Sequence, residues 1–380
     1  MNFINRLLYI VGLVTVFVFY SCSEDDNSEE IEKGQSTEEV VDDEETGDEQ
    51  ESVVPKNIDE YNQVEEGLKD YYFDEFVIGA ALEPASLEEA MEVELLKRHF
   101  GSITAENAMK WSSLQPTEGN FRWGYADQLI NFAKENGMKV RGHTLVWHTQ
   151  VPDWVFQDGG ETALKELVLE RMKTHITEVM TRYKNDVYVC DVVNEVIDDG
   201  NSRYRNSKWY QICGEDYIIE AFKTAREVAP DAKFFYNDYS ATQTTKRDKI
   251  YNLLKQLKDL ELIDGMGLQG HWNIDYPGLE MIGDAIEKYA SLGIEIHITE
   301  VDISIYRNND ESEMSYYQRE AEHIAAYDRA FIKFRSLSDF ITNVTFWGIA
   351  DNHTWLDNFP VKDRKNYPFL FDENYEPKGL

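Results

Sequence analysis

The sequence predicts an α/β protein whose strands and helices close into a (β/α)8 barrel. Short apolar runs rich in β-branched residues alternate eight times with longer segments of helical periodicity. Strict alternation indicates a parallel sheet, and eight units close most naturally into a barrel. A doubly wound open sheet is the alternative. It fits less well because the first strand runs into Gly79-Ala80-Ala81 rather than into a Gly-rich phosphate loop.

The expected strands are short apolar runs of the kind that a barrel buries on both faces. No internal repeat finer than one strand and one helix is visible, and no second domain. In chain order the strands are expected at residues 76–82, 102–106, 139–147, 187–195, 232–238, 265–271, 295–303 and 343–349.

The expected helices carry apolar residues three and four positions apart, the spacing of one buried helix face. Gly137 and Gly293 follow two of them, as glycine often does after a helix end, and Pro230 stops a third. In chain order the helices are expected at residues 58–75, 87–100, 127–136, 163–183, 215–228, 246–260, 279–292 and 312–336.

The last residues, 377–380, stand where the closing helix of such a barrel would begin. We therefore expect a barrel without its final C-terminal helix. Such a barrel would expose apolar surface of its first and eighth strands. Two explanations are open: the sequence is truncated, or the N-terminal helix and loops cover the gap.

Residues 1–21 have the layout of an export signal. Arg6 precedes an apolar run over residues 7–20 that is short for a membrane-spanning helix. Cys22 follows Ser21 directly, and this arrangement resembles a bacterial lipoprotein signal in which Cys22 becomes the lipidated first residue. We expect an exported lipoprotein at the outer membrane or cell surface, held to the membrane only by this lipid anchor. An ordinary secretory signal, and a secreted protein, is the alternative.

Residues 22–57 read as an acidic, disordered linker, which leaves residues 58–380 for the barrel. Between residues 23 and 52 there are fifteen Asp and Glu residues and one Lys. The segment therefore has too few apolar side chains to offset the conformational entropy that folding would cost. The whole chain has a formal net charge of −35, which would repel nucleic acid. The two remaining cysteines, Cys190 and Cys213, have no metal-ligand spacing and are expected as buried thiols, although export would allow them to pair.

Two carboxylates stand at the ends of strands that are otherwise apolar. The run at 187–195, VYVCDVVNE, ends in Glu195, and the run at 295–303, EIHITEVDI, contains Glu300. A buried carboxylate is costly unless it has a partner or a chemical role. A pair of facing carboxylates is the minimum equipment for cleaving a glycosidic bond.

Polar side chains and tryptophans follow seven of the eight expected strands. In a (β/α)8 barrel these C-terminal ends carry the active site. Sugar recognition needs directional hydrogen-bonding groups for hydroxyls and flat aromatic faces for pyranose rings. The strand ends carry Glu106, Asn107, Lys110, His143, Trp147, Gln150, Asn194, Asn237, Asp238, Tyr239, Gln269, His271, Asp302, Trp347 and Trp355.

Five motifs in the correct order resemble glycoside hydrolase family 10, the retaining endo-β-1,4-xylanases on a TIM barrel. They are TAENAMKW (104–111), GHTLVWHTQVPDW (142–154), DVVNE (191–195), GLQGHW (267–272) and ITEVDI (298–303). The resemblance implies that Glu195 is the acid/base and Glu300 the nucleophile, ~5–5.5 Å apart as retention requires. Glu300 would be ionised, while Glu195 would hold the proton that the leaving oxygen receives.

The resemblance also implies supporting roles. Asn194 would donate to the sugar 2-hydroxyl, and His271 would contact the nucleophile with Asp302 behind it. Trp347 and Trp355 would form a lid that leaves no room for a hydroxymethyl group and so favours xylose. Tyr239 and Gln269 would lie near the bond being cleaved. The wall on the glycone side would consist of Glu106, Asn107, Lys110, His143, Trp147 and Gln150.

Two departures from the family pattern concern substrate contacts. Ser240 stands where the family often has Asn after Asn-Asp-Tyr, which would alter contacts on the aglycone side. Residues 351–358, DNHTWLDN, match the usual Trp-bearing loop only in part.

Other functions remain open at this point. The chain could be another retaining β-1,4-glycanase, such as a mixed-linkage glucanase, or a non-catalytic glycan-binding lipoprotein. The histidines could suggest a metal-dependent hydrolase, but no His-x-His follows the first strand, so we expect neither metal nor cofactor. His297 has the opposite strand parity to Glu300 and is expected outside the barrel. We expect a monomer that binds xylan or xylo-oligosaccharides.

Overall fold

The computed structural model describes residues 66–307 and 314–379, all within one compact unit of the chain. The expected signal, Cys22, the acidic linker and the first part of the expected 58–75 helix lie outside the described residues. None of the helices that the model describes is both long enough and apolar enough to span a membrane. Cys190 and Cys213 are both buried and do not form a disulfide.

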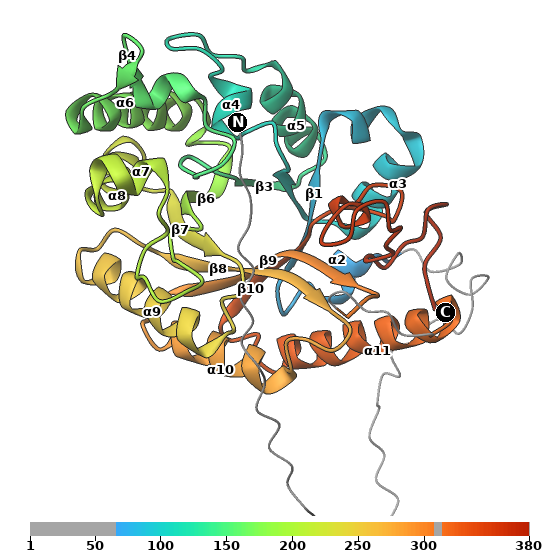
Figure 1. Cartoon of the computed structure of the whole chain (residues 1–380). Helices are drawn as coiled ribbons and strands as arrows, with labels where there is room; N and C mark the ends of the chain where they lie inside the picture. Colours follow the sequence, from blue (N-terminus) through green and yellow to red (C-terminus); the bar gives the residue numbers. More distant parts are fainter. Residues whose placement is uncertain (1–65, 308–313, 380) are drawn as a thin grey trace, which may run out of the picture. The chain divides into compact units, whose positions relative to one another are not determined.

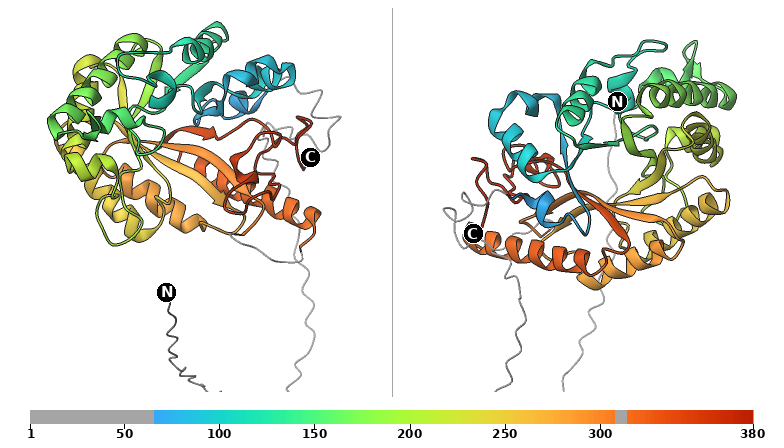
Figure 2. Two further views of the ribbon diagram at one scale, coloured as in Figure 1. Left: turned by 45° about the horizontal axis from the view of Figure 1, so that its top comes forward. Right: turned by 180° about the vertical axis from the view of Figure 1, so that it is seen from behind.

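Eight parallel strands close into a barrel surrounded by helices, which confirms the predicted fold (Figures 1 and 2). Neighbours around the barrel follow the order β1-β10-β9-β8-β7-β6-β3-β2. The strands are β1 (Val77–Leu82), β2 (Ser102–Ala105), β3 (Lys139–Gly142), β6 (Val187–Asn194), β7 (Lys233–Asp238), β8 (Gly265–Asn273), β9 (Glu295–Ser304) and β10 (Ile341–Phe346). A separate hairpin pairs β4 (Gln157–Asp158) with β5 (Glu161–Thr162).

The helices bury one face against the strands, as their apolar spacing predicted. Shorter helical turns lie in the loops, among them the 3-10 turns Pro84–Glu88, Asp153–Phe156 and Trp355–Asp357. The α-helices are α2 (Leu68–Tyr71), α3 (Ala90–His99), α4 (Trp111–Leu114), α5 (Gly124–Glu135), α6 (Lys165–Tyr183), α7 (Lys208–Cys213), α8 (Asp216–Val228), α9 (Thr244–Asp259), α10 (Leu279–Ala290) and α11 (Tyr316–Arg335).

One expected strand is shorter than its apolar pattern indicates. The run at 139–147 forms a regular strand only to Gly142, and the rest continues alongside β6 as an irregular segment with a single parallel bridge, between Val146 and Val193. Leu145 and Val146 still donate backbone hydrogen bonds to Asp191 and Val192, each of 3.0 Å. The segment therefore stays attached to β6 and holds its side chains over the strand that carries Glu195.

His297 lies inside the barrel, so its predicted position outside was wrong. Its Nδ1 lies 3.4 Å from Nε of Arg141 on β3, although three strands separate β3 from β9 in the sheet. Only a contact across the barrel interior can join them. Glu300 has a φ of 58°, which interrupts the alternation of side chains along β9, so His297 and Glu300 both face inward despite their odd spacing.

The first and last strands of the barrel are covered. The apolar side chains of β1 and β10 are buried, apart from the half-buried Val77, so the structure supports the alternative in which the gap is covered and not the one with exposed apolar surface. Phe331 of α11 stacks on Phe346 of β10, with ring centroids 6.0 Å apart. Tyr72, next to α2, stacks on Phe76 at 5.1 Å. Helix α11 and the segment after α2 therefore supply the cover.

Candidate active site

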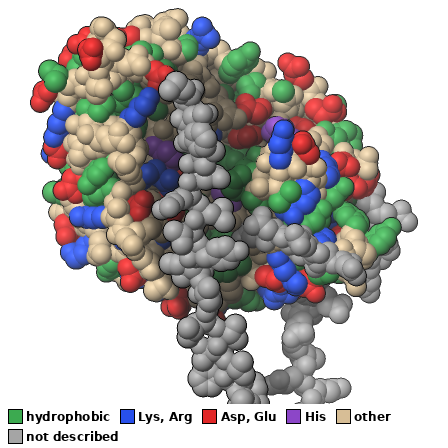
Figure 3. All heavy atoms as spheres, in the orientation of Figure 1, with side chains coloured by type: hydrophobic (Ala, Val, Ile, Leu, Met, Phe, Trp, Pro, Cys, Tyr) green, Lys and Arg blue, Asp and Glu red, His purple; other side chains and the backbone are tan. Residues whose placement is uncertain are grey.

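A cavity of about 820 Å³ opens at the C-terminal ends of the barrel strands. Figure 3 shows histidine side chains within a hollow of the face that Figure 1 presents. Asn107, Gln150 and Asp302 do not line the cavity directly; Gln150 is exposed, Asn107 is half-buried and Asp302 is buried. The sequence-predicted residues that do line it are Glu106, Lys110, His143, Trp147, Asn194, Glu195, Tyr239, Gln269, His271, Glu300, Trp347 and Trp355.

Glu300 is a buried carboxylate held by two donors. Its side chain accepts a 2.6 Å hydrogen bond from Nδ2 of Asn237, and its other oxygen lies 2.9 Å from Nε2 of His271. Burial alone would raise its pKa. The hydrogen bond from His271, the nearby histidine charges and the Asn237 amide outweigh burial and lower the pKa of Glu300 to about 2. Glu300 is therefore an anion at neutral pH.

His271 is held between two carboxylates. Its Nδ1 lies 2.9 Å from Asp302, and Asp302 also accepts a 2.7 Å hydrogen bond from Nε1 of Trp355. Burial disfavours the imidazolium, but Asp302 and Glu300 outweigh burial and raise the pKa of His271 to about 10. A protonated His271 has a donor on each ring nitrogen, so it can contact both carboxylates at once.

Glu195 has a different environment from Glu300. Trp147 donates from Nε1 to one carboxylate oxygen at 2.9 Å, and Gln269 donates from Nε2 to the other at 3.1 Å. Both of these donors are neutral. The Glu195 side chain is also more open, with 12% of its surface exposed against 6% for Glu300. One carboxylate is thus paired with a cation, whereas the other lies between neutral donors nearer to solvent.

A polar layer beneath the two carboxylates contains residues that the sequence analysis did not assign to the site. Arg141 forms a buried ion pair with Asp191, and His143 contacts Asp191 through Nδ1 at 2.9 Å. Asn237 bridges the Asn194 amide, at 2.9 Å, and Glu300. The signal was available, because Arg141 and Asp191 are charged residues in otherwise apolar strands.

One wall of the cavity is built around Lys110. Its ammonium lies 4.7 Å above the Trp147 ring and donates to Oδ1 of Asn107 at 3.1 Å. Gln150 donates to the same oxygen at 2.9 Å, so Asn107 joins the lysine to the exposed Gln150. Burial lowers the pKa of Lys110. Glu83, which accepts from Asn107, is a further supporting residue that sequence reasoning missed.

Aromatic rings form another part of the cavity. Trp347 packs edge-on against His143, and Trp355 packs edge-on against His271, with centroid distances of 5.4 and 5.0 Å. Phe359 stacks on Trp355 at 5.1 Å and also lines the cavity, although the sequence analysis did not select it. These rings give the apolar faces that sugar rings prefer.

On a further side, Tyr239 is fixed by charged neighbours. Lys246 lies 3.5 Å from its ring centroid, and Arg205 donates to its hydroxyl at 2.7 Å. The same Arg205 donates to the backbone oxygen of Glu195 at 2.9 Å. Ser240 and Gln243 also line the cavity here.

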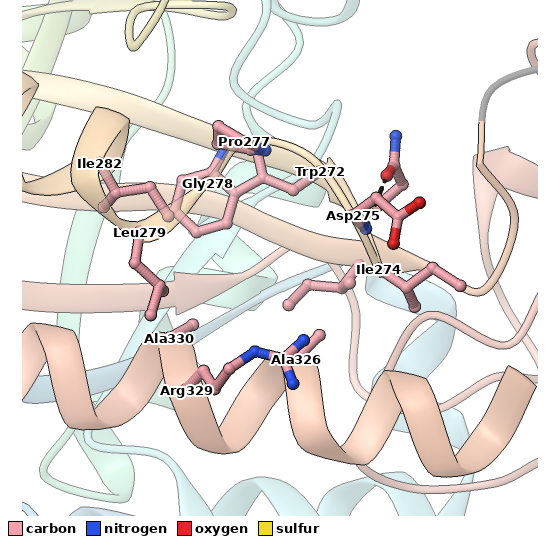
Figure 4. Close-up of a pocket in the computed structure, with 12 residues that line it drawn as sticks. Trp272, Ile274, Asp275, Pro277, Gly278, Leu279, Ile282, Ala326, Arg329 and Ala330 are labelled. Atoms are coloured by element: carbon pink, nitrogen blue, oxygen red, sulfur yellow. Dashed lines mark hydrogen bonds between the residues drawn. The ribbon is translucent and has the colours of Figure 1, made fainter. Parts of the chain in front are cut away.

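A second, smaller pocket borders the large cavity. Its volume is about 130 Å³, and it shares Trp272 and Asn273 with the cavity lining. Figure 4 shows it between the segment that follows β8 and helix α11, with Leu279 and Ala330 on opposite sides. Its lining is mostly apolar, and Arg329 stands at its edge.

Comparison with known proteins supplies independent evidence. Residues 67–380 match the model of Glycosyl hydrolase family 10. An endo-1,4-beta-xylanase B of Paenibacillus barcinonensis is 46% identical over 318 residues, covering 81% of this chain and 94% of that protein. An endo-1,4-beta-xylanase of Geobacillus stearothermophilus is 47% identical, covering 82% and 95%. The crystal structure of a Paenibacillus barcinonensis xylanase matches with a TM-score of 0.79 at 45% identity, covering 82% of this chain and 96% of that one.

Proposed function

The chain belongs to Glycosyl hydrolase family 10 and is an endo-1,4-β-xylanase, and we propose that it cleaves internal xylan bonds with Glu195 and Glu300 as its two catalytic residues. The observation that carries the assignment of roles is the contrast between the two carboxylates. Glu300 is paired with a histidine whose pKa is raised to about 10, whereas Glu195 has neutral donors. The first environment suits a nucleophile, the second a group that gains and loses a proton.

In the first step Glu300 attacks the anomeric carbon while Glu195 gives its proton to the leaving glycosidic oxygen. A bond forms between Glu300 and the sugar, the glycosidic bond breaks, and the aglycone leaves as an alcohol. In the second step Glu195, now a carboxylate, takes a proton from water. The oxygen of that water displaces Glu300 from the same face that the aglycone left, so the configuration is retained.

The remaining cavity residues bind and orient the substrate. Asn194, adjacent to Glu195, is suited to donate to the sugar 2-hydroxyl. Trp347 and Trp355 supply aromatic faces at the cleavage point and limit the space for a hydroxymethyl group, which supports xylose over glucose. Substrate contacts are also proposed for Glu106, Lys110, His143, Trp147, Tyr239, Gln269 and His271, with Asn107, Gln150 and Asp302 in support.

The test is product analysis on xylan, followed by chemical rescue with azide on an activated aryl xylobioside. Wild-type protein should release xylo-oligosaccharides, and Glu300→Ala should lower kcat about 10⁴-fold or more. Azide should restore turnover of Glu300→Ala with an α-glycosyl azide as product, and turnover of Glu195→Ala with a β-glycosyl azide. The same product from both variants would contradict the assigned roles. Binding of xylan without any hydrolysis would favour a non-catalytic glycan-binding protein.

The proposal includes export as a lipoprotein. It is supported by the apolar run at residues 7–20 followed by Ser21-Cys22, and by the acidic residues after it. Cys22 would carry the lipid, and the acidic segment would hold the barrel away from the membrane. Labelled palmitate should enter the wild-type protein but not Cys22→Ser when each is expressed in a bacterial host. Label in neither would favour the secreted alternative.

A further inference from the structure

Arg364 lines the catalytic cavity at a distance in sequence from every catalytic motif. Its guanidinium lies 3.9 Å from the centroid of the Tyr306 ring, and Tyr306 lines the same cavity. The backbone N–H of Arg364 donates to the carbonyl of Asp357 at 3.0 Å. Both the chain and the side chain of this arginine are therefore held in place.

Among residues 66–307 and 314–379, the side chain of Arg364 has no anionic partner. Its guanidinium makes no hydrogen bond or ion pair with these residues, and its Nε is buried without an acceptor. The other cations in the described cavity lining are engaged, since Lys110 donates to Asn107 and His271 contacts Glu300 and Asp302. Nearby Asp357 is already engaged, since it accepts from Lys365 at 3.1 Å and from the backbone of Asn366 at 2.8 Å.

The loop that bears Arg364 is hydrogen-bonded to the end of β9, the strand that carries Glu300. Asn366 is fully buried, donates to Oγ of Ser304 at 2.8 Å and accepts from the backbone of Ile305 at 3.2 Å. Ser304 ends β9, the strand that carries Glu300. The loop that bears Arg364 is thus fixed to the strand of the proposed nucleophile, so a group bound by Arg364 has a defined position relative to the reacting bond.

We propose that Arg364 binds the carboxylate of a uronic acid substituent on the xylan chain. The inference rests on the proposed xylanase function and names a substrate class for it. A guanidinium that stacks on an aromatic ring keeps the N–H groups along its edge free. Two of these N–H groups can donate parallel hydrogen bonds to the two oxygens of one carboxylate. The chain has a net charge of −35, so an acidic polysaccharide is repelled unless a local cation receives its charge.

The experiment compares one glucuronoxylan in two forms, native and with its uronic carboxyl groups reduced to alcohols. The readout is the ratio of kcat/KM on native to reduced polymer, which does not depend on the fraction of folded enzyme. Arg364→Gln should lower this ratio about 10-fold or more, as expected for a lost charge-assisted hydrogen bond. Arg364→Lys keeps the positive charge but lacks the two parallel donors. Its ratio should therefore lie between those of wild type and Arg364→Gln.

The matched control is Arg329→Gln. Arg329 is an exposed arginine on α11 at the edge of the pocket in Figure 4 and does not line the catalytic cavity. Its substitution should leave the ratio at the wild-type value. A wild-type ratio in Arg364→Gln, including an equal loss on both polymers, overturns the inference. If wild-type enzyme hydrolyses neither polymer, the proposed function itself is wrong.

Discussion

Glu195 and Glu300 share an uncommon backbone conformation, each with a φ of 58° in the left-handed region. In both strands the preceding residue also faces the barrel interior, since Asn194 contacts Asn237 and Thr299 donates to Asn237 at 2.6 Å. Two consecutive inward side chains are impossible in a regular strand. The left-handed residue allows them, and it delivers each carboxylate into the cavity at the cost of local strain.

His271 should control the ionisation of Glu300. Without the imidazolium, burial would dominate and the pKa of Glu300 would rise from about 2. Because only the anion attacks, the acid limb of the kcat/KM profile should move up by about two or more pH units in His271→Ala. Asp302→Asn should move it in the same direction by less, since His271 then loses one of its two carboxylates. An acid limb that stays in place in His271→Ala would contradict this account.

Asn237 should prove as important as the predicted residues. Asn237→Asp keeps the shape of the side chain but replaces the donor to Glu300 with a second carboxylate, next to an existing anion. We expect kcat to fall about 100-fold or more, because the lost donor and the repulsion both oppose the ionised nucleophile. Steady-state kinetics on an aryl xylobioside measures this. Thr299→Val removes only the donor that orients the Asn237 amide, so it should lower kcat by a smaller factor. A larger loss of kcat in Thr299→Val than in Asn237→Asp would refute the proposed role of Asn237.

The strand ends and the two carboxylates could be predicted because they depend on local pattern. Apolar runs mark the strands, and a polar residue at the end of a buried run stands out. Contacts across the barrel could not be predicted in the same way. The position of His297 required knowledge of the φ at Glu300. The pairing of Arg141 with Asp191 was equally hidden, because it joins adjacent strands through residues that are 50 positions apart in the sequence.

Loops were the least predictable part of the site. Asn107 and Gln150 were expected on the cavity wall, but the Asn107 amide oxygen accepts from both Lys110 and Gln150, so Asn107 joins the wall residue Lys110 to the exposed Gln150. Phe359 and Arg364 were not selected at all. Their place in the cavity depends on how the segment after Trp355 folds back onto β9. Hydrogen bonds of the buried Asn366 hold this segment against β9, and such long-range contacts leave no periodic pattern in the sequence.

The buried Arg141–Asp191 pair should be essential for stability. Both side chains are almost fully inaccessible, at 1% and 0% exposure. Arg141→Met would leave the Asp191 carboxylate buried without its cation and should lower the free energy of unfolding by about 3–5 kcal/mol. The double variant Arg141→Met/Asp191→Leu removes both charges. Its free energy of unfolding should fall by less than that of Arg141→Met alone. Urea denaturation of the two variants tests this, and a double variant less stable than the single one would contradict it.

His175 should make the barrel less stable in mild acid. It is fully buried, stacks on Trp111 at 3.9 Å, and burial lowers its pKa to about 3. A lowered folded pKa means that the contribution to stability is present above the unfolded pKa of about 6.5 and is lost as the pH falls toward 3. Between pH 7 and pH 5 this one group should lower the free energy of unfolding by about 2 kcal/mol. His175→Phe keeps the ring stack but cannot be protonated, so urea denaturation at the two pH values should show a drop smaller by that amount. An equal drop in both proteins would show that His175 takes up no proton on unfolding in this range.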